Sequence, residues 1–128
     1  MNTKNIITFI GALNIIQGIA FYFGAEMLTK QSFPEELLKE GGLAVGTAMH
    51  WPLAVTCIVL GIVILSTRNL DLSVAKKVLN YIGIAYSFFL INGLLQHFTT
   101  STNVPMPAIG LIALISILSF ITANRKTS

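Results

Sequence analysis

The sequence predicts an all-α membrane protein, a four-transmembrane-helix up-down bundle with a short interfacial helix on its outer side. Only 10% of the 128 residues are charged, whereas a soluble domain carries about 25%. The mean hydropathy is +0.77, and 54% of the residues are hydrophobic. Four uncharged runs cover residues 6–25, 43–66, 78–98 and 105–123, each within the span of about 17–25 residues that crosses a bilayer. We therefore expect a single integral membrane domain over residues 1–128.

The first run is expected to be a retained membrane span. Residues 6–25, which follow Lys4, are longer than a signal-peptide core of about 7–15 residues, and no small-x-small cleavage site ends them. Gly11 and Gly18 lie a heptad apart with Asn14 between them on one helical face. Because small residues let membrane helices approach closely, we interpret this face as a packing seam, with a ligand-facing seam as the alternative.

The longest loop follows the first run. Residues 26–42 hold four of the five acidic residues. Within them, Ser32-Phe-Pro-Glu35 fits a capping box, in which serine and glutamate satisfy the free N–H groups at a helix start. Gly41-Gly42 provides a stop signal. Together these signals predict a short helix of about two turns at the membrane surface.

The remaining runs carry signals for helix ends and bends. Pro52 leaves the carbonyl oxygen of Ala48 without its usual donor, and Trp51 suits the headgroup boundary. Asp71 offers the side chain that starts a helix before the third run. The link at residues 99–104 is short and uncharged, so we expect the third and fourth helices to be antiparallel neighbours.

The basic residues predict the orientation. The N-terminus, the middle loop and the C-terminus hold six basic residues, Lys4, Arg68, Lys76, Lys77, Arg125 and Lys126. The other two loops, at residues 26–42 and 99–104, hold two lysines beside four glutamates. Loops rich in lysine and arginine stay in the cytoplasm. We therefore expect a multi-pass protein of the bacterial inner membrane with both termini cytoplasmic and the glutamate-rich loop outside.

Polar side chains in the spans predict a pocket that faces outward. With the expected orientation, His50 and His97 lie on the same outer side. Asn92 and Gln96 share one face of the third run, and Tyr86 and His97 share an adjacent face, as the helical repeat requires. We hypothesise a polar pocket closed on the cytoplasmic side by apolar packing, and the candidate ligand-binding residues are Asn14, Gln17, His50, Trp51, Tyr86, Asn92, Gln96 and His97.

Several function classes receive little support. The net charge of +3 is scattered over short loops, so we expect no nucleic-acid partner. No nucleophile lies beside a base by spacing, and we expect no enzyme. The single Cys57 has no partner for an intrachain disulfide. Coupled transport usually needs a charge inside the membrane, which the four runs lack; an oligomeric channel or transporter for a small solute is an alternative.

A haem or metal site is the other alternative. His50 and His97 carry imidazoles that suit either group, and Glu26 is a third metal candidate near the outer surface. The spacings His-x-x-His and Glu-x-x-His are absent, as is a cysteine pair. We therefore expect no catalytic residue, no metal and no cofactor, with quinone or haem as the lesser alternatives.

The first run contains the glycine-rich segment Phe9-Ile-Gly11-Ala-Leu-Asn-Ile-Ile-Gln-Gly18. In this segment, in its length and in its four spans, the chain resembles the DoxX-like group of small bacterial four-span membrane proteins. Members of that group are often accessory subunits of quinone-linked or redox systems, so the resemblance implies a lipid- or quinone-facing accessory role. We expect a protein that lies in the lipid bilayer, alone, as a homo-oligomer or in a larger membrane complex. The leading hypothesis is that its outer half binds a lipid-like, quinone-like or small neutral ligand, or a membrane partner.

Overall fold

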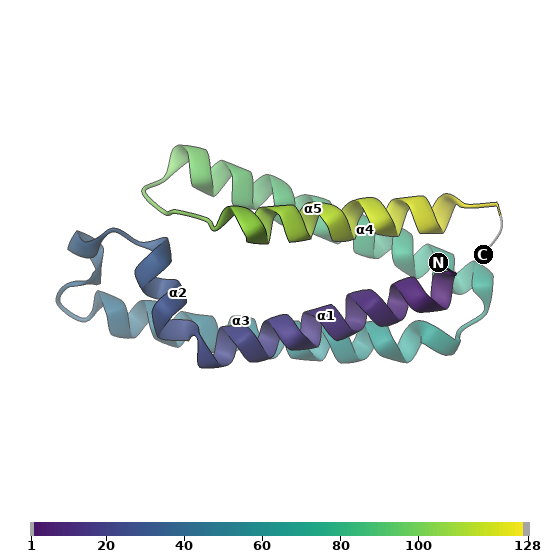
Figure 1. Cartoon of the computed structure of the whole chain (residues 1–128), viewed down its shortest axis with the longest axis horizontal. Helices are drawn as coiled ribbons and strands as arrows, with labels where there is room; N and C mark the ends of the chain where they lie inside the picture. The colour runs from purple at the N-terminus through teal and green to yellow at the C-terminus, as the bar shows by residue number, and fades with distance from the viewer. Residues whose placement is uncertain (1, 127–128) are drawn as a thin grey trace.

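The computed structural model describes residues 2–126, which form two antiparallel pairs of long helices (Figure 1). The described residues contain no strand, and their elements are α1 (Thr3–Phe23), α2 (Ala25–Ser32), η1 (Glu35–Leu38), α3 (Gly42–Ser66), η2 (Thr67–Asn69), α4 (Leu72–Thr99) and α5 (Met106–Asn124). Four of the α-helices are long and apolar enough to cross a membrane. The predicted class, an all-α four-helix membrane bundle, is confirmed.

Two helices begin earlier than the apolar runs do. Thr3 starts α1 because the side-chain oxygen of Asn2 accepts a hydrogen bond from the N–H of Asn5 at 2.9 Å, which caps the first turn. Leu72 starts α4, six residues before the predicted run. Hydropathy ends a run at the first charges, here Lys76 and Lys77, although both fit an exposed or half-exposed face of a continuing helix.

The loop after α1 differs from the prediction. Its main element is α2, which begins directly after Gly24, whereas the segment after Pro34 forms only the single turn η1. Ser32 is the last residue of α2, so it does not stand at the start of a helix as a capping box requires. The stop signal is present, since Gly41 adopts a left-handed φ of 93° just before α3.

Glycines bring α1 and α3 into backbone contact. A Cβ atom added at Gly61 would lie 2.6 Å from the carbonyl oxygen of Gly11, and one added at Gly18 would lie 2.6 Å from that of Ala54. Both neighbours are backbone atoms, which cannot rotate away as a side chain does. The predicted seam on α1 is therefore filled by α3 of the same chain. By contrast, a Cβ atom at Gly93 meets nothing within 4 Å.

The second pair, α4 and α5, combines a small residue with hydroxyl groups. A Cβ atom at Gly83 would lie 3.0 Å from the ring of Phe120, so α5 packs closely at this point. The hydroxyl of Ser116 donates to the carbonyl oxygen of Gly83 at 3.1 Å, and it lies 2.8 Å from the hydroxyl of Ser87. Hydroxyl groups that bond across helices are a common way to join helices in lipid.

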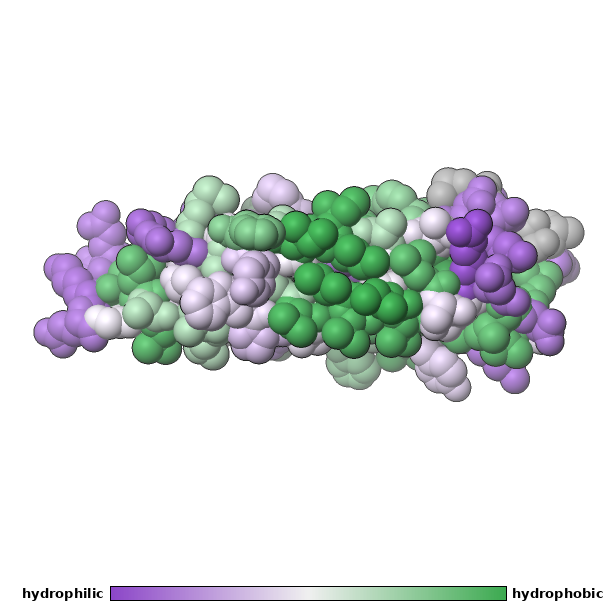
Figure 2. Space-filling model, turned by 90° about the horizontal axis from the view of Figure 1, so that it is seen from below, coloured by the Kyte–Doolittle hydropathy of each residue, from purple (hydrophilic) through white to green (hydrophobic). Residues whose placement is uncertain are grey.

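The two pairs meet in one half of the molecule. The buried apolar cluster contains residues of α1, α3, α4 and α5, namely Ile6, Ile7, Ile10, Ile64, Ala75, Leu79, Ile82, Tyr86, Ile115 and Ala123. These residues lie between the middle of the helices and the end that carries both termini, which we call the termini end; α2 lies at the opposite end, the α2 end (Figure 1). Hydrophilic residues gather at both ends of the face shown in Figure 2, with hydrophobic ones between them.

We expect Gly61→Ala to lower the free energy of unfolding by about 1–3 kcal/mol, because the added methyl group overpacks the contact with α1. Gly93→Ala is the matched control: its methyl group enters open space, and alanine favours a helix over glycine by up to about 1 kcal/mol. Helical circular dichroism during SDS titration of the protein in detergent micelles measures both variants. An equal loss in both would contradict the backbone contact of α1 and α3.

Candidate functional site

The central feature of the site is a buried hydrogen bond between Asn14 of α1 and Tyr86 of α4. The tyrosine hydroxyl donates to the side-chain oxygen of Asn14 at 2.6 Å, and the amide nitrogen of Asn14 donates to the carbonyl oxygen of Ile10 at 2.9 Å. The Asn14 side chain is 1% exposed and Tyr86 is 6% exposed. Both residues lie near the midpoints of their helices. This pair is the boundary at which the apolar cluster ends.

A cleft of about 240 Å³ lies at the α2 end, where the helix pairs are bridged by loops. Its walls come from Ser32 and Phe33 at the end of α2, His50 of α3, Gln96 of α4 and residues 102–105 of the link before α5. The N–H of Asn103 donates to the carbonyl oxygen of Ser32 at 2.8 Å, which ties the link to α2. Of the eight sequence candidates, the cleft includes His50 and Gln96.

Contacts with α2 and with its own helix fix how His50 is held. Its Nδ1 atom lies 2.8 Å from the carbonyl oxygen of Gly46 and 3.2 Å from the hydroxyl oxygen of Thr29. A carbonyl oxygen only accepts hydrogen bonds, and the Thr29 hydroxyl already donates to the carbonyl oxygen of Ala25 at 2.8 Å. Nδ1 therefore carries the proton. In a neutral imidazole this leaves Nε2 with a free lone pair that accepts a hydrogen bond.

Trp51 does not join His50 in this cleft. One residue further along an α-helix is about 100° around its axis, so the indole lies on another side of α3. Its ring centroid is 6.3 Å from that of Tyr22, and it lines a separate cleft with Glu26 and Leu38. The side chain is 47% exposed, an arrangement that fits its expected place at a membrane boundary.

The side chains of three further candidates have no hydrogen-bond partner in the described part of the chain. Gln17 is half-buried and Asn92 is exposed, and neither lines the cleft at the α2 end. His97 packs its ring edge-on against Phe98, with centroids 5.1 Å apart, and its Nδ1 atom is buried without a partner among residues 2–126. The geometry thus pairs Asn14 with Tyr86 and groups His50 with Gln96, but it does not bring all eight candidates into one space.

The metal alternative finds no matching geometry. Residues 2–126 contain no group of three histidine, cysteine, aspartate or glutamate side chains that could hold a metal ion. Glu26 is engaged instead by Lys30, whose Nζ atom lies 2.5 Å from its Oε1 atom. This hydrogen bond and the charge of Lys30 lower the pKa of the Glu26 carboxyl.

Sequence reasoning missed the residues that support His50 and the cleft. Thr29 is fully buried and holds His50, but it falls in a stretch that the sequence predicted to be a loop. Its close approach to α3 depends on Gly46, where an added Cβ atom would lie 2.4 Å from the Thr29 methyl carbon. Asn103 lies in the link before α5 and Ser32 at the end of α2, and no spacing rule relates such positions. The local feature of the sequence that could indicate this contact is Gly46, one helical turn before His50.

We expect Tyr86→Phe to destabilise the protein, because it leaves the buried oxygen of Asn14 without its donor. In a double-mutant cycle with Asn14→Leu, the coupling should be about 0.6–1.7 kcal/mol, between the average and the maximum found by such cycles for hydrogen bonds between membrane helices. SDS titration of the single and double variants gives this value. Tyr81→Phe, on the same helix at a side chain that is 70% exposed, should change little. A coupling near zero would show that the bond does not join the helix pairs.

The comparisons with known proteins add no relative to this geometry. No model of a protein family, no curated protein and no solved structure matches the chain.

Proposed function

We propose that this small integral membrane protein binds a lipid-like or quinone-like ligand, or another small neutral molecule, in the half of the bundle that lies toward α2. The observation that carries the proposal is the contrast between the two halves. The buried apolar cluster occupies the middle of the bundle on the termini side of Asn14 and Tyr86, whereas a cleft of about 240 Å³ with His50 and Gln96 in its walls lies at the α2 end.

The chemistry of the cleft favours a neutral ligand that both donates and accepts hydrogen bonds. Among residues 2–126, no lysine, arginine, aspartate or glutamate lines the cleft, so a charged ligand would lose its hydration without gaining a counter-ion. His50 offers the lone pair of Nε2, and the amide of Gln96 offers both donors and an acceptor. A quinol hydroxyl, a quinone carbonyl or a lipid ester group meets these requirements.

The position of the cleft favours a ligand that comes from the membrane. It adjoins the end of α4, where large apolar side chains such as Leu95 and Phe98 are 56% and 77% exposed. These side chains suit contact with lipid tails. An amphipathic ligand can therefore place its tail against lipid and its polar head in the cleft.

The charge distribution supports an orientation for this site. Basic residues at the termini end predict that both termini are cytoplasmic in a bacterial inner membrane, which places the cleft at the outer boundary. The DoxX-like resemblance of the first span agrees with an accessory role beside a quinone-linked system. Under this proposal the protein works as a binding subunit, as a monomer, as a homo-oligomer or within a larger membrane complex.

Decylubiquinone provides a direct test, because quinones quench tryptophan fluorescence and Trp51 is the single tryptophan. We expect saturable quenching when decylubiquinone is titrated into the protein in detergent micelles. Gln96→Leu should weaken binding about three- to tenfold, the cost of one lost hydrogen bond.

Gln31→Leu is the matched control, since Gln31 is an exposed glutamine of α2 outside the cleft. It should leave the quenching curve unchanged. Quenching that rises linearly without saturation would mean that the quinone only dissolves in the micelle. Equal weakening in the two variants would contradict binding in the cleft.

A further inference from the structure

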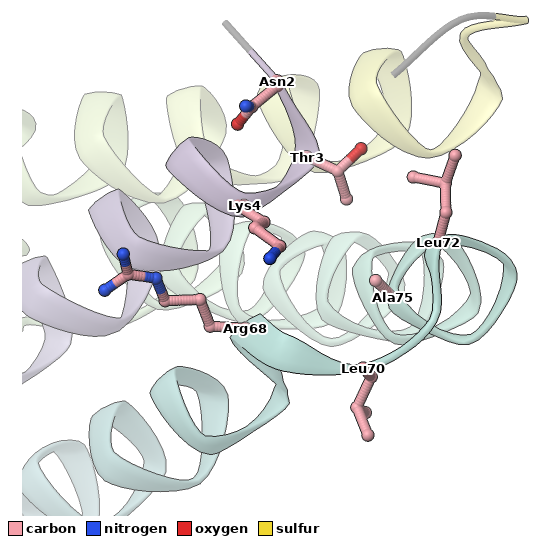
Figure 3. Close-up of a pocket in the computed structure, with 7 residues that line it drawn as sticks. All are labelled: Asn2, Thr3, Lys4, Arg68, Leu70, Leu72 and Ala75. Atoms are coloured by element: carbon pink, nitrogen blue, oxygen red, sulfur yellow. The ribbon is translucent and has the colours of Figure 1, made fainter.

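A second pocket lies at the termini end, away from the cleft beside α2. It has a volume of about 230 Å³ and is formed by residues 2–4 at the start of α1, Arg68 of η2, Leu70, and the first turn of α4 with Leu72 and Ala75 (Figure 3). Pockets for drug-sized ligands measure about 300–1,000 Å³. This pocket is therefore of a size for a small headgroup and not for a whole large ligand.

The pocket carries two positive charges that no carboxylate among residues 2–126 neutralises. Lys4 and Arg68 extend from α1 and η2 into the space between these elements (Figure 3). Among residues 2–126 the ion pair is that of Lys30 with Glu26, at the opposite end of the molecule. Asp71 is the one acidic residue near this end, and it does not line the pocket. Two cations in one pocket without a counter-charge favour an anionic ligand.

One hydrogen-bond donor without a partner among residues 2–126 also lines the pocket. Thr3 lines the pocket with a side chain that is 3% exposed, and its hydroxyl has no hydrogen-bond partner among the described residues. In Figure 3 this side chain is directed from α1 toward Leu72. Buried hydroxyl groups are rarely left unpaired, so this one points to a missing acceptor. The start of α1 adds the positive end of the helix dipole.

Leucines at the edge of the pocket favour a lipid over a free anion as the ligand. Leu70 and Leu72 line the pocket and are 43% and 45% exposed. Leu72 is the first residue of α4, and Leu70 lies just before it, two residues after Arg68. Exposed apolar side chains add nothing to the binding of a free phosphate ion, but they match the glycerol and acyl region that is covalently attached to a lipid phosphate.

We propose that this pocket binds the phosphate group of an anionic membrane lipid. Lys4 and Arg68 contact the phosphate oxygens, the hydroxyl of Thr3 donates a further hydrogen bond, and Leu70 and Leu72 contact the glycerol and acyl region. Guanidinium and ammonium groups are the donors that recognise phosphate most strongly in proteins. The site is separate from the cleft at the α2 end and does not depend on a ligand there.

Native mass spectrometry of the full chain in detergent tests the proposal with phosphatidylglycerol as the anionic lipid and phosphatidylcholine as the zwitterionic one. The wild-type protein should retain phosphatidylglycerol in preference to phosphatidylcholine, also in excess inorganic phosphate. Lys4→Gln/Arg68→Gln should weaken phosphatidylglycerol binding about 30-fold, the loss that two surface cations predict. Thr3→Val, which keeps the shape and removes the hydroxyl, should weaken it about three- to tenfold.

Lys76→Gln/Lys77→Gln is the matched control, because it removes the same charge from the same end of the molecule outside the pocket. It should retain phosphatidylglycerol as the wild-type protein does. If both double variants lost phosphatidylglycerol binding equally, the net charge of this end, and not the pocket, would account for binding, and the proposal would be overturned. Displacement of the lipid by inorganic phosphate would assign the pocket to a free anion and overturn the choice of a lipid. Circular dichroism confirms that each variant is folded.

Discussion

The hydrogen bond between Tyr86 and Asn14 is the interaction on which the arrangement of the bundle depends. Among the described residues of the four spans, it is the one side-chain hydrogen bond that crosses between the pair α1/α3 and the pair α4/α5. The hydrocarbon core of a bilayer has no water that could replace a missing partner. An asparagine near the middle of a span must therefore find a partner in the protein, and Tyr86 is the residue that meets it.

The same bond lies between the buried apolar cluster and the cleft at the α2 end. On one side of it, isoleucine and leucine side chains fill the space between the pairs. Each pair is held together by its own contacts: backbone against backbone at Gly61 in α1/α3, and the hydroxyl of Ser116 on the carbonyl oxygen of Gly83 in α4/α5. Because neither pair needs the other for its internal contacts, the packing between them can stop at mid-membrane and leave a cleft at the α2 end.

The number of spans and their approximate places could be predicted from hydropathy, since the cost of charges in lipid leaves a clear signal in the sequence. Hydropathy alone does not give the helix ends, because Lys76 and Lys77 interrupt hydropathy without interrupting α4. The predicted cap position, Asp71, did indicate where α4 begins. The polar candidates were identified by residue type and depth along a span. Rotation about the helix axis decides which of them meet, and rotation depends on contacts such as that of Gly61 with Gly11. Trp51 and His50, adjacent in sequence and about 100° apart around α3, line different clefts.

The four predicted runs contain no charged residue. Both proposed sites therefore lie toward the ends of the bundle. Acidic and basic residues are distributed unequally between the two ends. Glu26 is paired with Lys30 within α2, whereas Lys4 and Arg68 have no carboxylate partner among residues 2–126. None of the charged residues among 2–126 lines the cleft at the α2 end, so under the proposed function hydrogen bonding at His50 and Gln96 selects the ligand there. Lys4 and Arg68 leave net positive charge at the termini end. Under the two proposals, one bundle binds a neutral head at one boundary and an anionic head at the other, and its uncharged middle keeps the two sites apart.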